Sequence, residues 1–245
     1  MQQDAIRSSA DLLTTVFSRL DEIIEPGVST RDIDKVVEKT IKSGGGIPAF
    51  LGYGGFPASV CTSVNDQVIH GIPNGAPLNE GDIVGCDIGV ILDGYVSDAC
   101  KTYAVGEISL TTGKLLDVTR QALEAAISVC GPGVRVKDIG KAVMKSVEPY
   151  GYGIVRSFCG HGIGLSLHED PQIPNYYPSK GVNPRLRSGM VLAIEPMVNA
   201  GTSEVKVLED GWTVITSDGS LSAHFEHSIL ITDNGVEILS SWSAG

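Results

Sequence analysis

The chain has 245 residues, enough to bury a large hydrophobic core without disulfide bonds or a structural metal. Its 29 acidic and 18 basic residues give a net charge of −11, and lysine and arginine do not cluster, so the composition argues against nucleic-acid binding. The five cysteines are scattered, and no apolar stretch is long enough to serve as a signal peptide or to cross a membrane. We therefore expect a cytoplasmic protein with reduced thiols.

Two pairs of helices are expected from the spacing of apolar residues. Residues 5–24 have helical periodicity, and Ser29, with Asp32 three residues later, predicts the start of a second helix that ends at residues 44–46, three consecutive glycines. Residues 110–130 again have helical periodicity. After the break at residues 131–133, the next segment resembles the one that follows Ser29.

Parts of the sequence occur twice at a nearly constant separation. A Pro-Gly-Val and an Asp-Ile pair recur at an offset of 106, and residues 78–87 match residues 186–195 at an offset of 108. Each copy of the second pair ends in an acid, Asp87 or Glu195. We therefore expect two related halves, about 1–108 and 109–245, each with two helices followed by strands. Chance similarity between short amphipathic segments is the alternative.

A β-hairpin is predicted over residues 82–105, because two apolar runs flank Asp93-Gly94, a pair that favours a two-residue turn. In that register Gly89 faces Asp98 and Asp87 faces Cys100, so the two carboxylates lie on the same side of the hairpin. Two acids on apolar strands need a shared proton or a cation between them. An exposed edge hairpin with two solvated acids is the alternative.

Glu195 and Glu226 lie in apolar segments, residues 190–197 and 223–231, which we expect to form buried strands. Neither segment contains a lysine or arginine, so a metal ion is the simplest partner for each buried carboxylate. Four carboxylates and several histidines form an oxygen-rich ligand set that suits Mn, Fe, Co or Zn in a two-metal site.

Four of the five histidines lie near these acids or near glycine-rich turns. Gly160, Gly162 and Gly164 make a helix through His161 improbable, so we expect a turn-rich segment there. Beside the carboxylates, His161 is expected to be a metal ligand, and His70 and His168 to handle protons. Structural, hydrogen-bonded histidines are the alternative for each.

The order of these motifs resembles the methionine aminopeptidases of the pita-bread fold, peptidase family M24, in their short type I form. The resemblance covers nearly the whole chain and rests on two acids eleven residues apart, Gly-His-Gly-Ile-Gly, Ile-Glu-Pro-Met and a last Glu before His. It implies an α+β fold in which two pseudo-symmetric halves form a curved antiparallel sheet covered by helices. Residues 1–245 would form a single catalytic domain.

The resemblance also implies two divalent metal ions, Co, Mn, Fe or Zn. Asp98 and Glu226 would bridge the ions, Asp87 would bind the first, and His161 and Glu195 would bind the second. A hydroxide between the metals would attack the scissile carbonyl while Glu195 carries its proton.

Around these ligands, the family pattern assigns roles to the substrate-facing residues. His168 would stabilise the oxyanion and His70 would contact the scissile amide. The methionine pocket would be formed by Phe50, Tyr53, Phe56, Cys61 and Trp212, unless these are ordinary core residues. Phe50 and Phe56 stand where some members carry Cys and Tyr, and Gly54 where some carry His, so the volume of the pocket is open.

The implied function is that of a methionyl aminopeptidase, a hydrolase that removes the initiator methionine from nascent proteins when the second residue is small. Its partners would be N-terminal peptides, with at most a transient contact with the ribosome, and the protein would be a monomer without nucleic-acid or membrane binding. Two alternatives share the fold. X-Pro dipeptidases and aminopeptidases usually carry a separate N-terminal domain, and a non-enzymatic binding protein would have lost its metal ligands.

Overall fold

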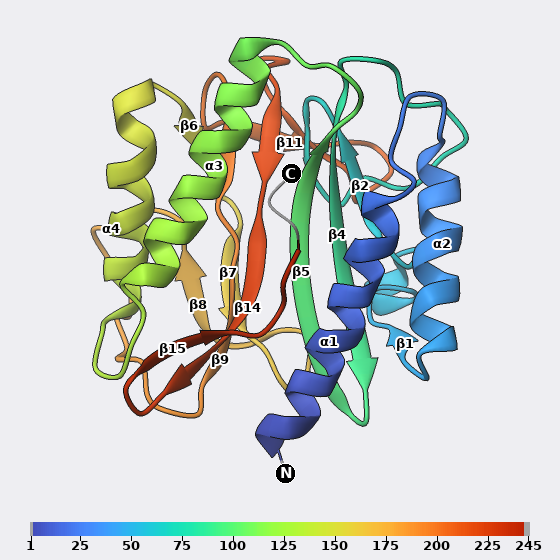
Figure 1. Ribbon diagram of the computed structural model, residues 1–245. Coiled ribbons are helices and arrows are strands. Elements are labelled where there is room, and N and C mark those ends of the chain that lie inside the picture. Colours follow the sequence, from blue (N-terminus) through green and yellow to red (C-terminus); the bar gives the residue numbers. More distant parts are fainter. Residues whose placement is uncertain (1, 243–245) are drawn as a thin grey trace.

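The computed structural model describes residues 2–242, in which helices cover one face of a large sheet (Figure 1). The α-helices of this region are α1 (Gln2–Asp21), α2 (Thr30–Ser43), α3 (Leu110–Ser128) and α4 (Val136–Val147). All four lie within a few residues of the segments predicted from apolar periodicity, which confirms those helices. No helix among the described residues is long and apolar enough to span a membrane.

Side-chain caps mark the start of two helices. The Ser29 hydroxyl accepts a hydrogen bond from the backbone N–H of Asp32 and donates one to the Asp32 carboxylate, as the sequence predicted for α2. Ser109 caps α3 in the same way through the N–H of Thr112. Arg135 precedes α4 without a side-chain cap.

The large sheet is antiparallel at every pairing, with the order β1-β4-β5-β14-β9-β7-β8, and β2 pairs with β4 while β15 pairs with β14. In sequence order its strands are β1 (Ile47–Pro48), β2 (Cys61–Val64), β4 (Ile83–Leu92), β5 (Tyr95–Ala104), β7 (Cys159–Gly162), β8 (Glu169–Pro174), β9 (Val191–Ile194), β14 (Glu226–Thr232) and β15 (Gly235–Ile238). The strands β5 and β14 therefore join the two halves of the sequence at the centre of the sheet.

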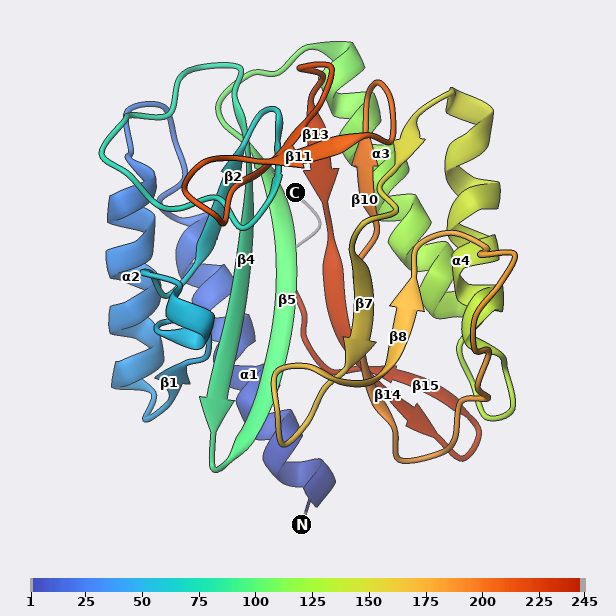
Figure 2. The same ribbon diagram turned by 180° about the vertical axis from the view of Figure 1, so that it is seen from behind.

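Two further sheets are small, and Figure 2 shows the large sheet from the side that the helices leave open. One contains β6 (Gly153–Ile154), β10 (Met197–Asn199) and β13 (Ser222–His224). The other contains β3 (Gln67–Ile69), β11 (Val205–Val207) and β12 (Val214–Thr216). Short 3-10 helices at η1 (Tyr53–Gly55) and η2 (Glu148–Tyr150) complete the described elements.

The predicted hairpin register is confirmed at every position between β4 and β5. Leu92 pairs with Tyr95, Gly89 with Asp98 and Asp87 with Cys100. The turn residue Asp93 has φ 51° and the following glycine φ 81°, the left-handed pair that a tight hairpin turn requires. Because β4 and β5 lie inside the sheet, the alternative of an exposed edge hairpin is wrong.

Two hydrophobic cores lie between the sheet and the helices, one for each half. The first packs side chains of α1 and α2 against β4 and β5, and the second packs α3 and α4 against strands of the second half. Trp242 contacts both cores. Ala99 belongs to the first core, so its neighbour Asp98 points to the opposite face, away from the helices.

The expectation that Glu195 lies inside a strand was wrong. Strand β9 ends at Ile194 and β10 begins at Met197, so Glu195 and Pro196 connect the large sheet to a small one. Pro196 has no backbone N–H to donate to a neighbouring strand, which favours the end of a strand at this position. The chain returns from this small sheet to the large sheet at Phe225, which separates β13 from β14.

The expectation of a turn-rich segment was wrong for His161 itself, although residues 164–168 do bend and the exclusion of a helix was correct. His161 lies on β7, which pairs with β9 through Ala193 and with β8 on its other side. A Cβ atom on Gly160 would lie 2.3 Å from the Ala193 carbonyl oxygen, and one on Gly162 would lie 2.3 Å from the Asp170 carbonyl oxygen. The glycines therefore allow close strand approach here, not a turn.

Candidate metal centre and substrate cavity

A cavity of about 190 Å³ opens on the face of the sheet opposite the helices. All twelve residues that the sequence selected as metal-binding, catalytic or substrate-binding line it, together with Leu167. They are Phe50, Tyr53, Phe56, Cys61, His70, Asp87, Asp98, His161, His168, Glu195, Trp212 and Glu226.

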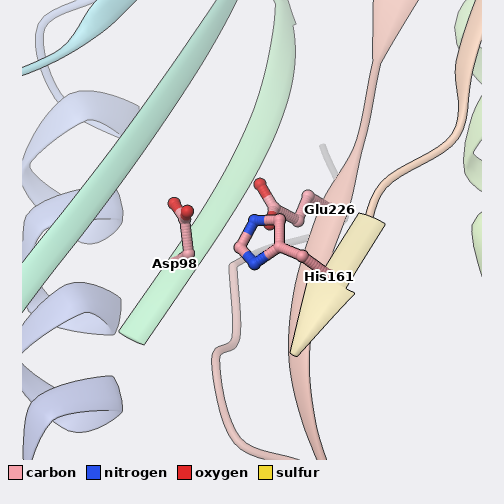
Figure 3. A group of neighbouring side chains, drawn as sticks. All are labelled: Asp98, His161 and Glu226. Atoms are coloured by element: carbon pink, nitrogen blue, oxygen red, sulfur yellow. The ribbon is translucent and has the colours of Figure 1, made fainter. Parts of the chain in front are cut away.

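Three potential ligands converge from three strands of the large sheet: Asp98 from β5, His161 from β7 and Glu226 from β14 (Figure 3). One ligand atom from each lies within 4.8 Å of the other two. Asp98, His161 and Glu226 are 4%, 8% and 2% exposed. Strands distant in sequence therefore bring a mixed oxygen and nitrogen donor set to one point.

Three buried carboxylate oxygens of the cavity have no hydrogen-bond partner among the described residues. They are one oxygen each of Asp87, Asp98 and Glu226. A buried carboxylate oxygen without a donor is costly, and neither lysine nor arginine lines the cavity. Oxygen donors with one imidazole are the ligands of Mn, Fe, Co and Zn, so these residues fit a divalent ion.

Burial shifts the protonation of all four carboxyl groups in the same direction. It raises the pKa of Asp87 to about 7, and burial together with the neighbouring Asp87 charge raises the pKa of Asp98. The pKa values of Glu195 and Glu226 are raised for the same reason, burial first and other acids second. Without a cation, like charges in this pocket favour the protonated forms.

His161 is oriented to present a free ring nitrogen to the cluster. Its Nδ1 lies 2.9 Å from the carbonyl oxygen of Gly162, so Nδ1–H donates and Nε2 keeps its lone pair. Burial lowers the pKa of His161 to about 4, which keeps the ring neutral. Nε2 lies 3.6 Å from Glu195 Oε1. Two electron-pair donors face each other there, an arrangement that suits a metal ion between them.

His168 stands at the mouth of the cavity, beside Tyr53. Its Nδ1 lies 2.8 Å from the Tyr53 hydroxyl, and its ring centre is 4.4 Å from that of His161. Partial burial lowers the pKa of His168. A neutral ring that accepts from Tyr53 at Nδ1 carries its proton on Nε2, which makes Nε2 a hydrogen-bond donor for a substrate oxygen.

His70 lies at the end of β3 with φ 57°, a left-handed conformation that is uncommon for a residue other than glycine. Its ring meets Phe158 and Trp212 edge-on, at centroid distances of 5.8 and 6.3 Å. Burial, with a smaller contribution from His168, lowers the pKa of His70 to about 4. The imidazole is therefore neutral at the cavity wall.

The apolar end of the cavity is formed by the predicted pocket residues and by Leu167, which the sequence did not select. Leu167 packs in one cluster with Phe50, Phe56 and Cys61. Phe56 meets Trp212 edge-on at a centroid distance of 5.2 Å. Leu167 directly precedes His168 in the sequence, and this position was the signal that could have identified it as a cavity residue.

The two histidines around Glu226 have different surroundings. His227 points away from the cavity, where its Nδ1 lies 3.0 Å from the Ser240 hydroxyl and its ring stacks on Trp242. His224, which received no role from the sequence, lies with Nε2 3.7 Å from Glu195 Oε2. Its position two residues before Glu226 was the signal available in the sequence.

Comparison with known proteins gives a consistent result. The model of metallopeptidase family M24 matches residues 4–233. The chain is 48% identical to the methionine aminopeptidase of Clostridium acetobutylicum, over 96% of this chain and 94% of that protein, and 48% identical to methionine aminopeptidase 1 of Bacillus subtilis, over 96% and 94%.

Solved structures show the same relationship. The crystal structure of methionine aminopeptidase from Thermotoga maritima superposes with a TM-score of 0.94 at 44% identity, covering 98% of this chain and 96% of that one. Prolidase from Pyrococcus furiosus superposes with a TM-score of 0.80 at 24% identity over 99% of this chain and 64% of that one, a likeness of fold alone. The α+β pita-bread fold predicted from the sequence is confirmed, and the chain belongs to metallopeptidase family M24.

Proposed function

We propose that this member of family M24 is a methionine aminopeptidase, which removes the N-terminal methionine from nascent proteins when the second residue is small. The observation that carries the proposal is the juxtaposition of the Asp98, His161 and Glu226 cluster with the apolar end of one cavity. A peptide whose first side chain fills the apolar end would hold its first peptide bond beside the acids. The names of the relatives agree with this activity.

Five residues would hold two divalent ions, Mn, Co, Fe or Zn. Asp87, Asp98, Glu195 and Glu226 would supply carboxylate oxygens, and His161 would supply its Nε2. When bound, such a pair of ions supplies a water of lowered pKa and polarises the scissile carbonyl. The unpartnered carboxylate oxygens and the free His161 Nε2 support this ligand set.

Glu195 would accept the proton of the attacking water and pass it to the leaving amine. Its side chain is 12% exposed, and burial raises its pKa, so a proton can reside on it during the reaction. The 3.6 Å distance between its Oε1 and His161 Nε2 supports this role.

Two neutral histidines would contact the substrate backbone. His168 would donate from Nε2 to the oxyanion, with Tyr53 holding the tautomer through Nδ1. His70 would contact the scissile amide on the leaving side. Both sit on the cavity wall, and their lowered pKa values keep them uncharged at neutral pH.

The methionine side chain would occupy the pocket of Phe50, Tyr53, Phe56, Cys61 and Trp212. Aromatic rings and a thiol suit a flexible, polarisable thioether. The 245 residues would act as one catalytic domain built from two pseudo-repeats, with the site at their junction. The protein would work as a monomer in the cytoplasm, where contact with the ribosome would be transient.

The test uses purified protein loaded with Mn or Co and three tripeptides. We expect release of methionine from Met-Ala-Ser, no cleavage of Met-Lys-Ser, and no cleavage of Ala-Pro-Ser. The Asp98→Asn variant should lose the activity, and calorimetric titration with Mn should give about two ions per wild-type chain. Preferential cleavage of Ala-Pro-Ser would show an X-Pro peptidase instead, and full activity of Asp98→Asn would contradict the metal assignment.

A further inference from the structure

Glu195 lies between two imidazoles, and only one of them belongs to the proposed ligand set. His161 Nε2 is 3.6 Å from Oε1, and His224 Nε2 is 3.7 Å from Oε2. His224 is 3% exposed, and its Nε2 has no hydrogen-bond partner among the described residues. A buried polar atom aimed at a carboxylate, with no other partner, points to a role at that carboxylate.

The fold holds the backbone of His224 from both sides. In the small sheet it pairs with Met197, two residues after Glu195. Its backbone N–H donates to the Thr102 hydroxyl at 3.0 Å, and that hydroxyl donates to the His224 carbonyl oxygen at 2.7 Å. Thr102 lies on β5, the strand that carries Asp98. The backbone of His224 is therefore fixed relative to the strand that carries Asp98 before any substrate arrives.

The two imidazoles differ in what they offer to Glu195. His161 uses its Nδ1 proton on the Gly162 carbonyl, so it presents a lone pair at Nε2. His224 is buried, and in its neutral form an imidazole carries a single N–H. A neutral imidazole with the proton on Nε2 is the complement of a carboxylate oxygen. The 3.7 Å separation is about 0.5 Å longer than an N–H···O bond, a gap that active sites commonly close in the working complex.

We propose, as an extension of the proposed function, that His224 is a positioning residue that donates a hydrogen bond from Nε2–H to Glu195 Oε2. With Oε2 held in this way, Oε1 faces His161. Without this donor, the Glu195 carboxyl group can rotate about its terminal bond, and either oxygen can face His161. The water would then meet its proton acceptor in the wrong orientation in most encounters.

Two substitutions distinguish the loss of the hydrogen-bond donor from the loss of the volume that the ring fills. His224→Gln keeps an N–H near the position of Nε2, whereas His224→Leu keeps comparable volume without a donor. With Met-Ala-Ser we expect His224→Leu to lower kcat by about 10- to 100-fold with KM within about twofold, and His224→Gln to stay within about threefold of wild type. His227, a partly buried neighbour whose Nδ1 faces Ser240, offers the matched control, and His227→Leu should keep its kcat.

A second readout does not depend on turnover. In Zn-loaded, 15N-labelled protein, long-range proton–nitrogen spectra distinguish Nε2–H from Nδ1–H imidazoles, and the signal absent from His224→Gln identifies His224. We expect the Nε2–H form. Calorimetric titration with Mn should give the same number of ions for wild type and His224→Gln.

Three results would overturn the inference: an Nδ1–H tautomer, equal kcat values for His224→Leu and wild type, or the loss of one metal ion in His224→Gln, which would make His224 a ligand. Because the tautomer is read without substrate, it decides the inference even if His224→Leu does not fold. Failure of the proposed function would look different, since wild-type protein itself would then leave Met-Ala-Ser intact.

Discussion

The Tyr53 hydroxyl lies 2.8 Å from Nδ1 of His168, a residue 115 positions later in the chain. Tyr53 is on the short 3-10 helix η1, and His168 directly precedes β8. The contact joins the first half of the sequence to the second across the mouth of the cavity. When the hydroxyl donates to Nδ1, the proton of the neutral ring is on Nε2, and the proposed oxyanion contact depends on that proton.

Tyr53→Phe removes this hydroxyl and keeps the aromatic ring. We expect kcat for Met-Ala-Ser to fall about 10-fold, with KM changed by less than about threefold, because the lost hydrogen bond orients a group that acts in the transition state. Steady-state kinetics of the Mn-loaded protein measures both constants. Tyr177→Phe, an exposed tyrosine outside the cavity lining, is the control. A rise in KM with unchanged kcat would show that the hydroxyl serves only in substrate binding.

The sequence predicted best where a local signal determines the geometry. The Asp93-Gly94 turn permits one register, and that register placed Asp87 and Asp98 on the same side before any tertiary contact was known. The cap formed by Ser29 is equally local. In both cases the interacting residues are close in sequence, so few alternative arrangements compete.

The positions of the other site residues could not be derived from local signals. His161 and Glu226 reach Asp98 only through the pairing of β5 with β14, of β14 with β9 and of β9 with β7, strands that are distant in sequence. Periodicity in the glycine-rich β7 segment is weak, and its strand exists because glycine permits close approach to β9. Family resemblance, not register, placed these two residues among the expected ligands.

The affinity for divalent metal should depend on pH through the buried acids. Burial raises the pKa of Asp87 to about 7 and raises those of Asp98, Glu195 and Glu226 as well, so below pH 7 protons occupy the ligand oxygens. A metal ion must displace these protons, and affinity therefore falls as pH falls. His161, with a pKa of about 4, is neutral throughout this range and adds no competing proton.

From pH 5.5 to 7.5 we expect the Kd for Mn to decrease by roughly tenfold per pH unit for each proton displaced. Isothermal titration calorimetry in two buffers with different ionisation enthalpies gives both the Kd and the number of protons released. The Asp87→Asn variant should bind more weakly and release fewer protons. A Kd that stays constant over this range, with no proton release, would show that the acids are already ionised in the metal-free protein.

Close approach of two strands positions His161, and Gly160 is the residue that permits it. A Cβ atom at Gly160 would lie 2.3 Å from the Ala193 carbonyl oxygen, whereas at Gly164 the nearest heavy atom would be 3.6 Å away. We therefore expect Gly160→Ala to reduce the free energy of unfolding by about 2 kcal/mol or more and to weaken Mn binding, because β7 must move away from β9 with its histidine. Gly164→Ala, on the same segment, should change both quantities little. Urea unfolding and Mn titration of the two variants compare them directly, and equal behaviour would mean that β7 is not held at this distance by its glycine.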